Sequence, residues 1–499
     1  MSDHLPTTRD EAELCAWLGD FTERTIETAC AHVFLGAEAA FKMKRHVDLG
    51  YADFSTAEKR LWALERELEF NRGAAPDIYR AIRRITREPG GFTFEGQGEV
   101  ADYVLEMRRF DESKVLSACP DAVTGDMAEA LGRTIARVHA EAPLKPDAAW
   151  NGMVFPTATT ARLLREMADR LGHERVERLV SLTDAELKRQ RPLLQARSAQ
   201  GFGRRCHGDL HLGNILLEDG QPILFDCIEF NDQISDIDIQ FDLAFLLMDL
   251  EFRERPGAAV RVLSAWLDQA GRTFGEALWE GMAALPLMLS VRAGIRAHVS
   301  AHSGDDALSR AYVDAAIAHL SPPPAALVAV GGLSGTGKSR FARAIAPSIG
   351  PSPGAVVLRT DEVRKRLMNL SPTDRLPASA YAGELYGRTY DVLIDNARTL
   401  LKAGRGVIVD ATFMDAPLRE RVAALAADCG VPFEGVWLEA PAEVLRARVA
   451  GRSGDASDAT VETLEMQLAR ATDPVGWTRI DTSGPKGQSA ETWLAARVS

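Results

Sequence analysis

Three polar residues that lie close together in the chain have the types that phosphoryl transfer requires. Asp209 and Asn214 are five positions apart, and Asp226 follows two short apolar runs, residues 215–217 and 222–225. Transfer of a phosphoryl group from ATP needs one carboxylate to orient or deprotonate the attacking hydroxyl, and an Asn and an Asp to hold magnesium on the phosphates. We therefore expect Asp209 to be catalytic, and Asn214 and Asp226 to be ligands of Mg²⁺.

A second set of residues, late in the chain, has the spacing of a nucleotide-binding loop. The pattern Gly-x-x-x-x-Gly-Lys-Ser follows an apolar run typical of a strand and precedes a predicted helix at 341–345. In this Walker A pattern, backbone N–H groups surround the phosphates, the lysine reaches the β- and γ-phosphate oxygens, and the serine hydroxyl binds magnesium. The residues expected to bind ATP are Gly332, Ser334, Gly335, Thr336, Gly337, Lys338 and Ser339, of which Ser339 is also a magnesium ligand.

The segment around Asp209 opens with His-Gly-Asp and keeps the Asp-to-Asn interval of the protein-kinase catalytic loop. This form resembles the aminoglycoside phosphotransferase family, a kinase-like fold that acts on small molecules. The resemblance implies that Asp242, at the start of an apolar helix, fixes the catalytic loop through backbone amides.

Asp361, Arg364 and Asp410 follow two further apolar runs near the Walker A pattern. Asp410 ends the run 406–410 and fits the Walker B position near magnesium. The Asp-x-x-Arg of Asp361 and Arg364 resembles small P-loop kinases of the gluconate kinase, polynucleotide kinase and zeta-toxin type. The resemblance implies that Asp361 activates or positions the acceptor hydroxyl and that Arg364 binds the acceptor or a phosphate. A helix N-cap at Asp361 with a solvated Arg364 is the alternative.

Arg448 and Arg452 are four positions apart, so they share one face of a predicted helix. They resemble the arginine-bearing lid of nucleoside-monophosphate-kinase-like enzymes, where arginines stabilise charge on the transferring phosphoryl group. The resemblance implies a catalytic role for both, and solvated helix arginines are the alternative.

A lysine near the N-terminus is the candidate for contact with ATP in the first half of the chain. The run Ala-Ala-Phe-Lys that ends at Lys42 resembles the Val-Ala-Ile-Lys strand of kinases, which implies that Lys42 pairs with the α- and β-phosphates. Lys44 shares its face of the strand and is the competitor.

A glutamate on a predicted helix at 55–71 should orient this lysine. Glu67 is preferred because the sequence that follows it, through 76–79, is similar to that of the phosphotransferase family. Glu58 and Glu65 remain alternatives.

The elements that must position these residues follow from hydrophobic periodicity. We expect a mainly helical stretch at 1–30, a hairpin of strands at 33–35 and 39–43, a strand at 100–107, and helices through 111–205 and on to 319.

A Ser-Pro-Pro-Pro segment at 321–324 is a stiff linker, because proline fixes φ and donates no hydrogen bond. We predict an α+β protein-kinase-like, bilobal domain over 1–320, with a small lobe at about 1–110 and a helical lobe at about 111–320. An α/β P-loop NTPase domain follows at 325–499, where strands alternate with helices and imply a parallel sheet.

The composition of the chain restricts the kinds of partner that we expect. The 499 residues carry a formal net charge of −13, which argues against a general nucleic-acid binder. The six cysteines are scattered without a Cys-x-x-Cys pair, the N-terminus is polar, and no apolar run is long enough for a membrane span. We expect a cytoplasmic protein that does not enter membranes; its oligomeric state is not indicated.

As a whole, the sequence resembles the bacterial family of bifunctional aminoglycoside phosphotransferase/ATP-binding proteins, over nearly its full length. It departs from the pattern in two places: Asp226 is followed by Cys-Ile and not by Phe-Gly, and no glycine-rich loop precedes Lys42, where residues 28–33 would have to serve. No residue selects an aminoglycoside, so the family name does not indicate antibiotic resistance.

These observations predict an ATP- and Mg²⁺-dependent phosphotransferase with two nucleotide sites, each acting on a hydroxyl of a small molecule such as a sugar. Two such sites in one chain suggest successive phosphorylation of one metabolite. A polynucleotide 5′-hydroxyl kinase in the second half is one alternative. The other is that one domain is a degenerate regulator that senses ATP.

Overall fold

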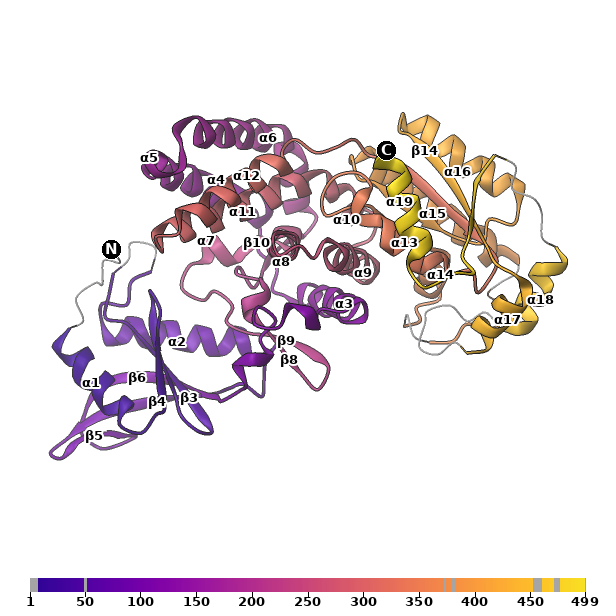
Figure 1. Ribbon diagram of the computed structural model, residues 1–499. Helices are drawn as coiled ribbons and strands as arrows, with labels where there is room; N and C mark the ends of the chain where they lie inside the picture. Colours follow the sequence, from indigo (N-terminus) through magenta and orange to yellow (C-terminus); the bar gives the residue numbers. More distant parts are fainter. Residues whose placement is uncertain are drawn as a thin grey trace.

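The computed structural model describes residues 8–48, 52–371, 374–377, 380, 383–451, 460–470 and 476–498. These residues form two parts that pack side by side (Figure 1). The first has a small lobe built on an antiparallel sheet and a larger helical lobe. The second is a parallel sheet surrounded by helices. The fold class predicted from the sequence is confirmed.

The small lobe is a six-stranded antiparallel sheet in the order β1-β2-β3-β6-β4-β5, with α2 packed against β4 and β6. Strand β3 pairs with β2 on one side and with β6 on the other. This pairing fixes the positions of Lys42 and Lys44 in the small lobe. The elements are α1 (Arg9–Gly19), β1 (Arg24–Glu27), β2 (Ala31–Leu35), β3 (Ala39–Lys44), α2 (Ala57–Arg72), β4 (Tyr79–Glu88), β5 (Gly91–Phe94) and β6 (Glu99–Arg108).

The helical lobe surrounds α8, whose residues from Ile239 to Leu250 are all buried. Most of them are apolar, and the exceptions are Gln240, Asp242 and Asp249. Two short strand pairs, β7 with β10 and β8 with β9, frame the loop that carries Asp209. The elements are α3 (Gly125–Glu141), α4 (Ala148–Glu166), α5 (Ala168–Leu171), α6 (His173–Ala199), β7 (Gly203–Arg205), β8 (Ile215–Glu218), β9 (Gln221–Leu224), α7 (Asp232–Ser235), β10 (Asp236–Asp238), α8 (Ile239–Phe252), α9 (Pro256–Phe274), α10 (Ala277–Glu280), α11 (Leu285–His302) and α12 (Asp306–His319).

The second part has a five-stranded parallel sheet in the order β12-β13-β11-β14-β15. The carboxyl ends of parallel strands share one edge, so Gly332, Arg359 and Asp410 meet there. The elements are β11 (Leu327–Gly332), α13 (Lys338–Ile345), β12 (Val356–Arg359), α14 (Thr360–Leu367), α15 (Gly383–Lys402), β13 (Val407–Asp410), α16 (Ala416–Cys429), β14 (Phe433–Glu439), α17 (Ala442–Ala450), α18 (Val461–Ala469), β15 (Thr478–Asp481) and α19 (Gln488–Val498).

Helix α9 joins the two parts. It packs along α3 on one side and contacts β12, α13 and α14 on the other (Figure 1). Val260 of α9 belongs to the hydrophobic core of the parallel sheet, and the Ser264 hydroxyl accepts a hydrogen bond of 3.3 Å from the Val357 N–H of the edge strand β12. The segment at 321–324 is therefore not the only connection between the halves.

The structure differs from expectation in the small lobe. The stretch at 1–30, expected to be mainly helical, contains α1 and then β1, which pairs with β2. The strands β4 and β5 were not expected. In β4, long charged side chains hide the alternation of a strand, and β5 has only four residues, Gly91–Phe94. In the part of the chain that the structure describes, no helix is long and apolar enough to cross a membrane.

Candidate phosphotransfer sites

Asp242 of α8 fixes the backbone of the loop that carries Asp209. Its Oδ1 accepts a hydrogen bond of 2.9 Å from the Gly208 N–H, and its Oδ2 one of 3.2 Å from the His207 N–H. The contact with loop amides that the resemblance implied for Asp242 is confirmed. Burial disfavours its charge, but the hydrogen bond with His139 and nearby positive charges outweigh burial and lower the pKa of Asp242.

Asp209 and Asn214 face each other across this loop. The Asn214 amide donates to Asp209 Oδ2 and to the Asp209 carbonyl oxygen, both at 2.9 Å. His211 Nε2 lies 3.3 Å from Asp209 Oδ2. Desolvation opposes ionisation, yet the hydrogen bond and charge of His211 outweigh it and hold the pKa of Asp209 below its usual range. Asp209 is therefore a carboxylate at neutral pH, able to accept a hydrogen bond from a hydroxyl.

The structure brings Lys42, Glu67 and Asp226 together from three separate elements. Lys42 Nζ donates to Glu67 Oε1 of α2 and to Asp226 Oδ1 after β9, both at 2.6 Å. Burial lowers the pKa of Lys42, but the carboxylates of Asp226 and Glu67 more than offset this and raise it well above its ordinary value. This cation therefore joins β3 and α2 of the small lobe to the segment after β9 of the helical lobe.

Lys44, the competitor, has other partners. Its ammonium donates to Glu67 Oε2 at 2.7 Å and forms an ion pair with Glu229. One carboxylate of Glu67 thus orients both lysines, whereas Glu58 and Glu65 are exposed on α2. Glu229 was not assigned a role from the sequence, because nothing in its local pattern marks a partner in β3.

Asp226 has a left-handed backbone, with φ of 60°, and two residues of the small lobe support it. The Tyr79 hydroxyl accepts a hydrogen bond from the Asp226 N–H, and Asn71 Oδ1 accepts one from the Cys227 N–H, both at 2.9 Å. Sequence analysis missed both roles. For Tyr79 the available signal was its place in the 76–79 segment that resembles the phosphotransferase family.

The Walker A loop lies between β11 and α13 in the geometry that its glycines allow. Gly332, Gly335 and Gly337 have φ values of 139°, 86° and 87°, which other residues rarely adopt. Lys338 Nζ donates to the Leu333 carbonyl at 2.9 Å. The Ser339 hydroxyl donates to Asp410 Oδ2 at 2.5 Å, so the two expected magnesium ligands meet at one point.

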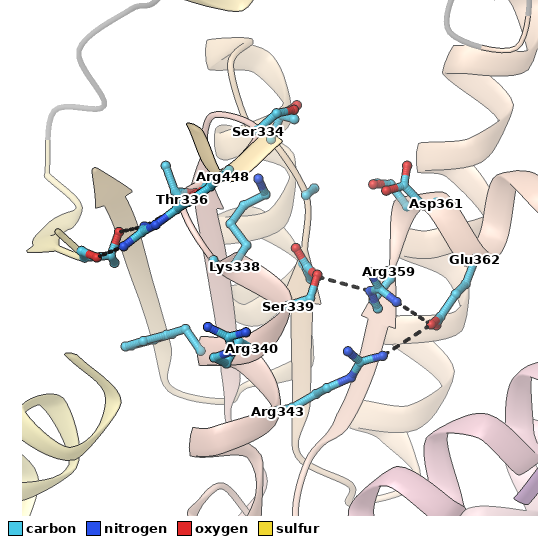
Figure 2. Close-up of a pocket in the computed structure, with 18 of the residues that line it drawn as sticks. Ser334, Thr336, Lys338, Ser339, Arg340, Arg343, Arg359, Asp361, Glu362 and Arg448 are labelled. Carbon is cyan, nitrogen blue, oxygen red and sulfur yellow. Dashed lines mark hydrogen bonds and ion pairs between the residues drawn. The ribbon is translucent and has the colours of Figure 1, made fainter. Parts of the chain in front are cut away.

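Asp361 lies in the first turn of α14, and Arg364 follows in its last turn. Figure 2 shows Asp361 across the site from Lys338. Arg364 Nη1 donates to Asp361 Oδ1 at 3.1 Å. Burial raises the pKa of Asp361, and the charges of Arg359 and Arg364 offset this only in part. The N-cap position of α14 is Arg359, so Asp361 is not its N-cap. Together these residues line a cavity of about 1730 Å³ that also contains the Walker A loop.

Arg359, which the sequence analysis did not assign, lies between Asp410 and Glu362. Its Nε is 3.4 Å from Asp410 Oδ2, and its Nη1 donates to Glu362 Oε1 at 2.9 Å (Figure 2). The signal was present, because Arg359 ends the apolar run 355–358 at the same sheet edge as the other ligands.

In the region that resembles the lid of nucleoside-monophosphate-kinase-like enzymes, Arg448 of α17 and Gln467 of α18 lie beside the Walker A loop. Arg448 Nη2 donates to the Thr482 carbonyl at 2.6 Å, and its Nη1 lies 3.5 Å from the Gly335 carbonyl. Gln467 of α18 accepts a hydrogen bond of 2.8 Å from the Ser334 N–H of the Walker A loop. Arg452 lies outside the described residues, so its expected partnership with Arg448 stays a prediction.

Both sites have donor sets that suit ATP with magnesium. The Walker A loop already places a side-chain oxygen on the Ser334 N–H, the contact that a phosphate oxygen would make. Ser339 and Asp410 in one site, and Asn214 and Asp226 in the other, offer the oxygen ligands that magnesium prefers.

Comparison with known proteins gives the family. Residues 79–285 match the phosphotransferase enzyme family, and residues 327–474 match an AAA domain. An uncharacterised protein of Mycobacterium tuberculosis is 32% identical over 493 residues, with 94% of this chain and 95% of the relative covered. The chain belongs to the bifunctional aminoglycoside phosphotransferase/ATP-binding protein family. The family suspected from the sequence is confirmed.

Two further similarities concern the second half of this family member. An adenylyl-sulfate kinase of Myxococcus xanthus is 36% identical over 120 residues, which are 23% of this chain and 59% of that protein. A gluconokinase structure from Sinorhizobium meliloti has 22% identity and a TM-score of 0.25, and covers 35% of this chain and 93% of its own. With a domain of the phosphotransferase enzyme family and a P-loop kinase-like AAA domain, the protein is an ATP-dependent kinase. Kinases of these types use ATP and generally Mg²⁺.

Proposed function

We propose that the protein uses two ATP sites, each transferring the γ-phosphate to a hydroxyl of a small molecule, a sugar or another metabolite. The two functional units would be residues 1–320 and 325–499. The observation that carries the proposal is the meeting of Ser339 and Asp410 at the Walker A loop, with a partly buried Asp361 in the same cavity.

In the P-loop site, Lys338 and the loop amides would bind the phosphates, and Ser339 and Asp410 would hold magnesium. Asp361 then accepts the proton of the acceptor hydroxyl, which its raised pKa favours because a stronger base takes the proton more readily. Arg364, which donates a hydrogen bond to Asp361, would orient the acceptor beside it.

In the kinase-like site, Asp209 would orient the acceptor hydroxyl, and Asn214 and Asp226 would hold magnesium. Support comes from the hydrogen bonds between Asp209 and Asn214, and from the ion pair of Lys42 with Asp226. ATP would replace Asp226 as a partner of the Lys42 ammonium, since its phosphates carry the same charge sign.

The test is a metabolite-library screen for ATP consumption with the unaltered protein, Asp209→Asn and Lys338→Ala. Each variant should lose its own step while the other step remains. If both variants formed product at the unaltered rate, the two-site proposal would be wrong. A labelled-ATP assay with a DNA or RNA oligonucleotide distinguishes the small-molecule acceptor from a polynucleotide 5′-hydroxyl at the P-loop site.

A further inference from the structure

A continuous series of charge contacts runs from Asp410 to the other half of the chain. Arg359 lies between Asp410, at 3.4 Å, and Glu362, at 2.9 Å. Arg343 lies 3.9 Å from the same oxygen of Glu362 (Figure 2). Arg343 also forms an ion pair with Glu129 of α3, at 2.6 Å. The series therefore begins at an expected magnesium ligand and ends in the helical lobe of the kinase-like half.

The P-loop end of this series is buried. The side chains of Arg359 and Asp410 are 4% and 5% exposed, and the two residues are paired in neighbouring strands. A buried guanidinium beside a carboxylate restrains the orientation of the carboxylate, because turning it away would leave both buried charges uncompensated. The charge of Arg359 also acts on Asp361, where it opposes the rise in pKa that burial causes.

The middle of the series lies on the elements that form the P-loop site. Arg343 is on α13, the helix that begins at Lys338, and Glu362 is on α14, next to Asp361. A shift of the Arg343 guanidinium would therefore disturb both α13, which begins at Lys338, and α14, which carries Asp361.

The far end is a single carboxylate shared by three guanidinium groups. Glu129 lies 2.6 Å from Arg343, 3.0 Å from Arg261 and 3.7 Å from Arg133. Burial and the charge of Arg343 lower the pKa of Arg261, which shows how closely these cations are packed. Without the negative charge of Glu129, the like charges would repel and Arg343 would move.

We propose that Glu129, a residue of the kinase-like half, is a positioning residue of the P-loop site. It holds Arg343 and, through Glu362, the guanidinium of Arg359, which sets the orientation of Asp410. The inference rests on the phosphotransfer function proposed for the P-loop site. The kinase-like half then completes that site.

The test compares Glu129→Gln with Glu251→Gln in the full chain. Both changes remove a carboxylate at the boundary between the halves, but Glu251 contacts Ser352, away from the series. For Lys338-dependent turnover, Glu129→Gln should lower kcat about tenfold and raise the Mg²⁺ concentration needed for half the maximal rate, with KM for ATP unchanged. Glu251→Gln should leave kcat and the Mg²⁺ requirement as they are.

Arg343→Met breaks the same contact from the P-loop side and should reproduce the effect, with partial recovery in Arg343→Lys. If Glu129→Gln does not fold, the Mg²⁺ requirement of Arg343→Met tests the inference in its place. An unchanged Mg²⁺ requirement in both Glu129→Gln and Arg343→Met, or an equal loss in Glu251→Gln, overturns the inference alone. If the unaltered protein shows no Lys338-dependent binding of ATP with Mg²⁺, the inference and the proposed function both fail.

Discussion

The Lys42 ammonium lies 2.6 Å from the Asp226 carboxylate, across 184 positions of sequence. The contact joins β3 of the small lobe to the segment after β9 of the helical lobe. Each residue neutralises the other: Asp226 raises the pKa of Lys42, and Lys42 lowers the pKa of Asp226 against the effect of burial. The charged states of Lys42 and Asp226 therefore depend on the position of the small lobe relative to the helical lobe.

Lys42→Met should weaken ATP binding at the kinase-like site about tenfold or more, because a charge-assisted contact to phosphate is lost. The fold should persist, since Glu67 keeps Lys44 as a partner. ATP binding measured in the Lys338→Ala background reports this site alone.

Lys44→Met is the matched control for that variant. It removes the cation that pairs with the buried carboxylate of Glu229, while Glu67 keeps Lys42, so the free energy of unfolding should fall by about 3–5 kcal/mol. Equal destabilisation by both lysine variants would contradict the separate roles of Lys42 and Lys44.

Asp209→Asn should lower kcat at the kinase-like site at least about 100-fold while ATP still binds, because the amide cannot accept the proton or align the hydroxyl as the carboxylate does. The measurement is product formation from an identified acceptor in the Lys338→Ala background. Asp219→Asn, in the exposed turn between β8 and β9, is the control and should keep full activity. A wild-type rate in Asp209→Asn would refute the assignment.

Local patterns predicted much of this molecule. The Walker A loop, the strand end at Asp410 and the place of Asp361 directly after a strand follow from glycine spacing and apolar runs, which are properties of neighbours in sequence. Glu67 was chosen over Glu58 and Glu65 by resemblance, and the structure places it at both lysines.

Other features depend on contacts between distant segments and leave no local sign. Strand β4 has charged residues on its exposed face, so its sequence lacks the alternation typical of a strand. Only its pairing with β6 in the structure identifies it. The ion pair of Glu129 with Arg343 forms only because α3 and α13 are brought together through α9, and neither residue has a distinctive neighbour in sequence.

Asp361 should give the P-loop reaction an acidic limb. Burial raises the pKa of Asp361 above that of an ordinary aspartate, and a general base acts only when deprotonated. The rate should therefore rise with pH through this raised pKa, and Asp361→Asn should lower kcat about 100-fold and abolish the limb. Profiles of kcat against pH in the Asp209→Asn background measure it. If Asp361→Asn kept the acidic limb, the limb would belong to another titratable group.

Glu251 should make stability depend on pH. Burial raises its pKa to about 7, so the folded protein binds a proton that the unfolded chain releases near the ordinary value of glutamate, about 4.3. The resulting stability is fully present below the unfolded pKa and is lost as pH rises through about 7. Glu251→Gln should raise Tm at pH 8 and have little effect at pH 4. Thermal unfolding at both values tests this, and an equal shift at the two would contradict it.

Gln467→Glu should weaken ATP binding at the P-loop site. The Gln467 side-chain oxygen accepts a hydrogen bond from the Ser334 N–H, one of the amides expected to meet a phosphate. A carboxylate there would hold this N–H more strongly and repel the phosphates, so Kd for ATP should rise about tenfold. Gln467→Leu removes the acceptor without adding charge and should bind ATP more tightly than Gln467→Glu. Calorimetric titration in the Lys42→Met background, where ATP binding at the kinase-like site is weakened, separates the P-loop site from it. Equal affinities of the two variants would show that Gln467 does not share the phosphate position.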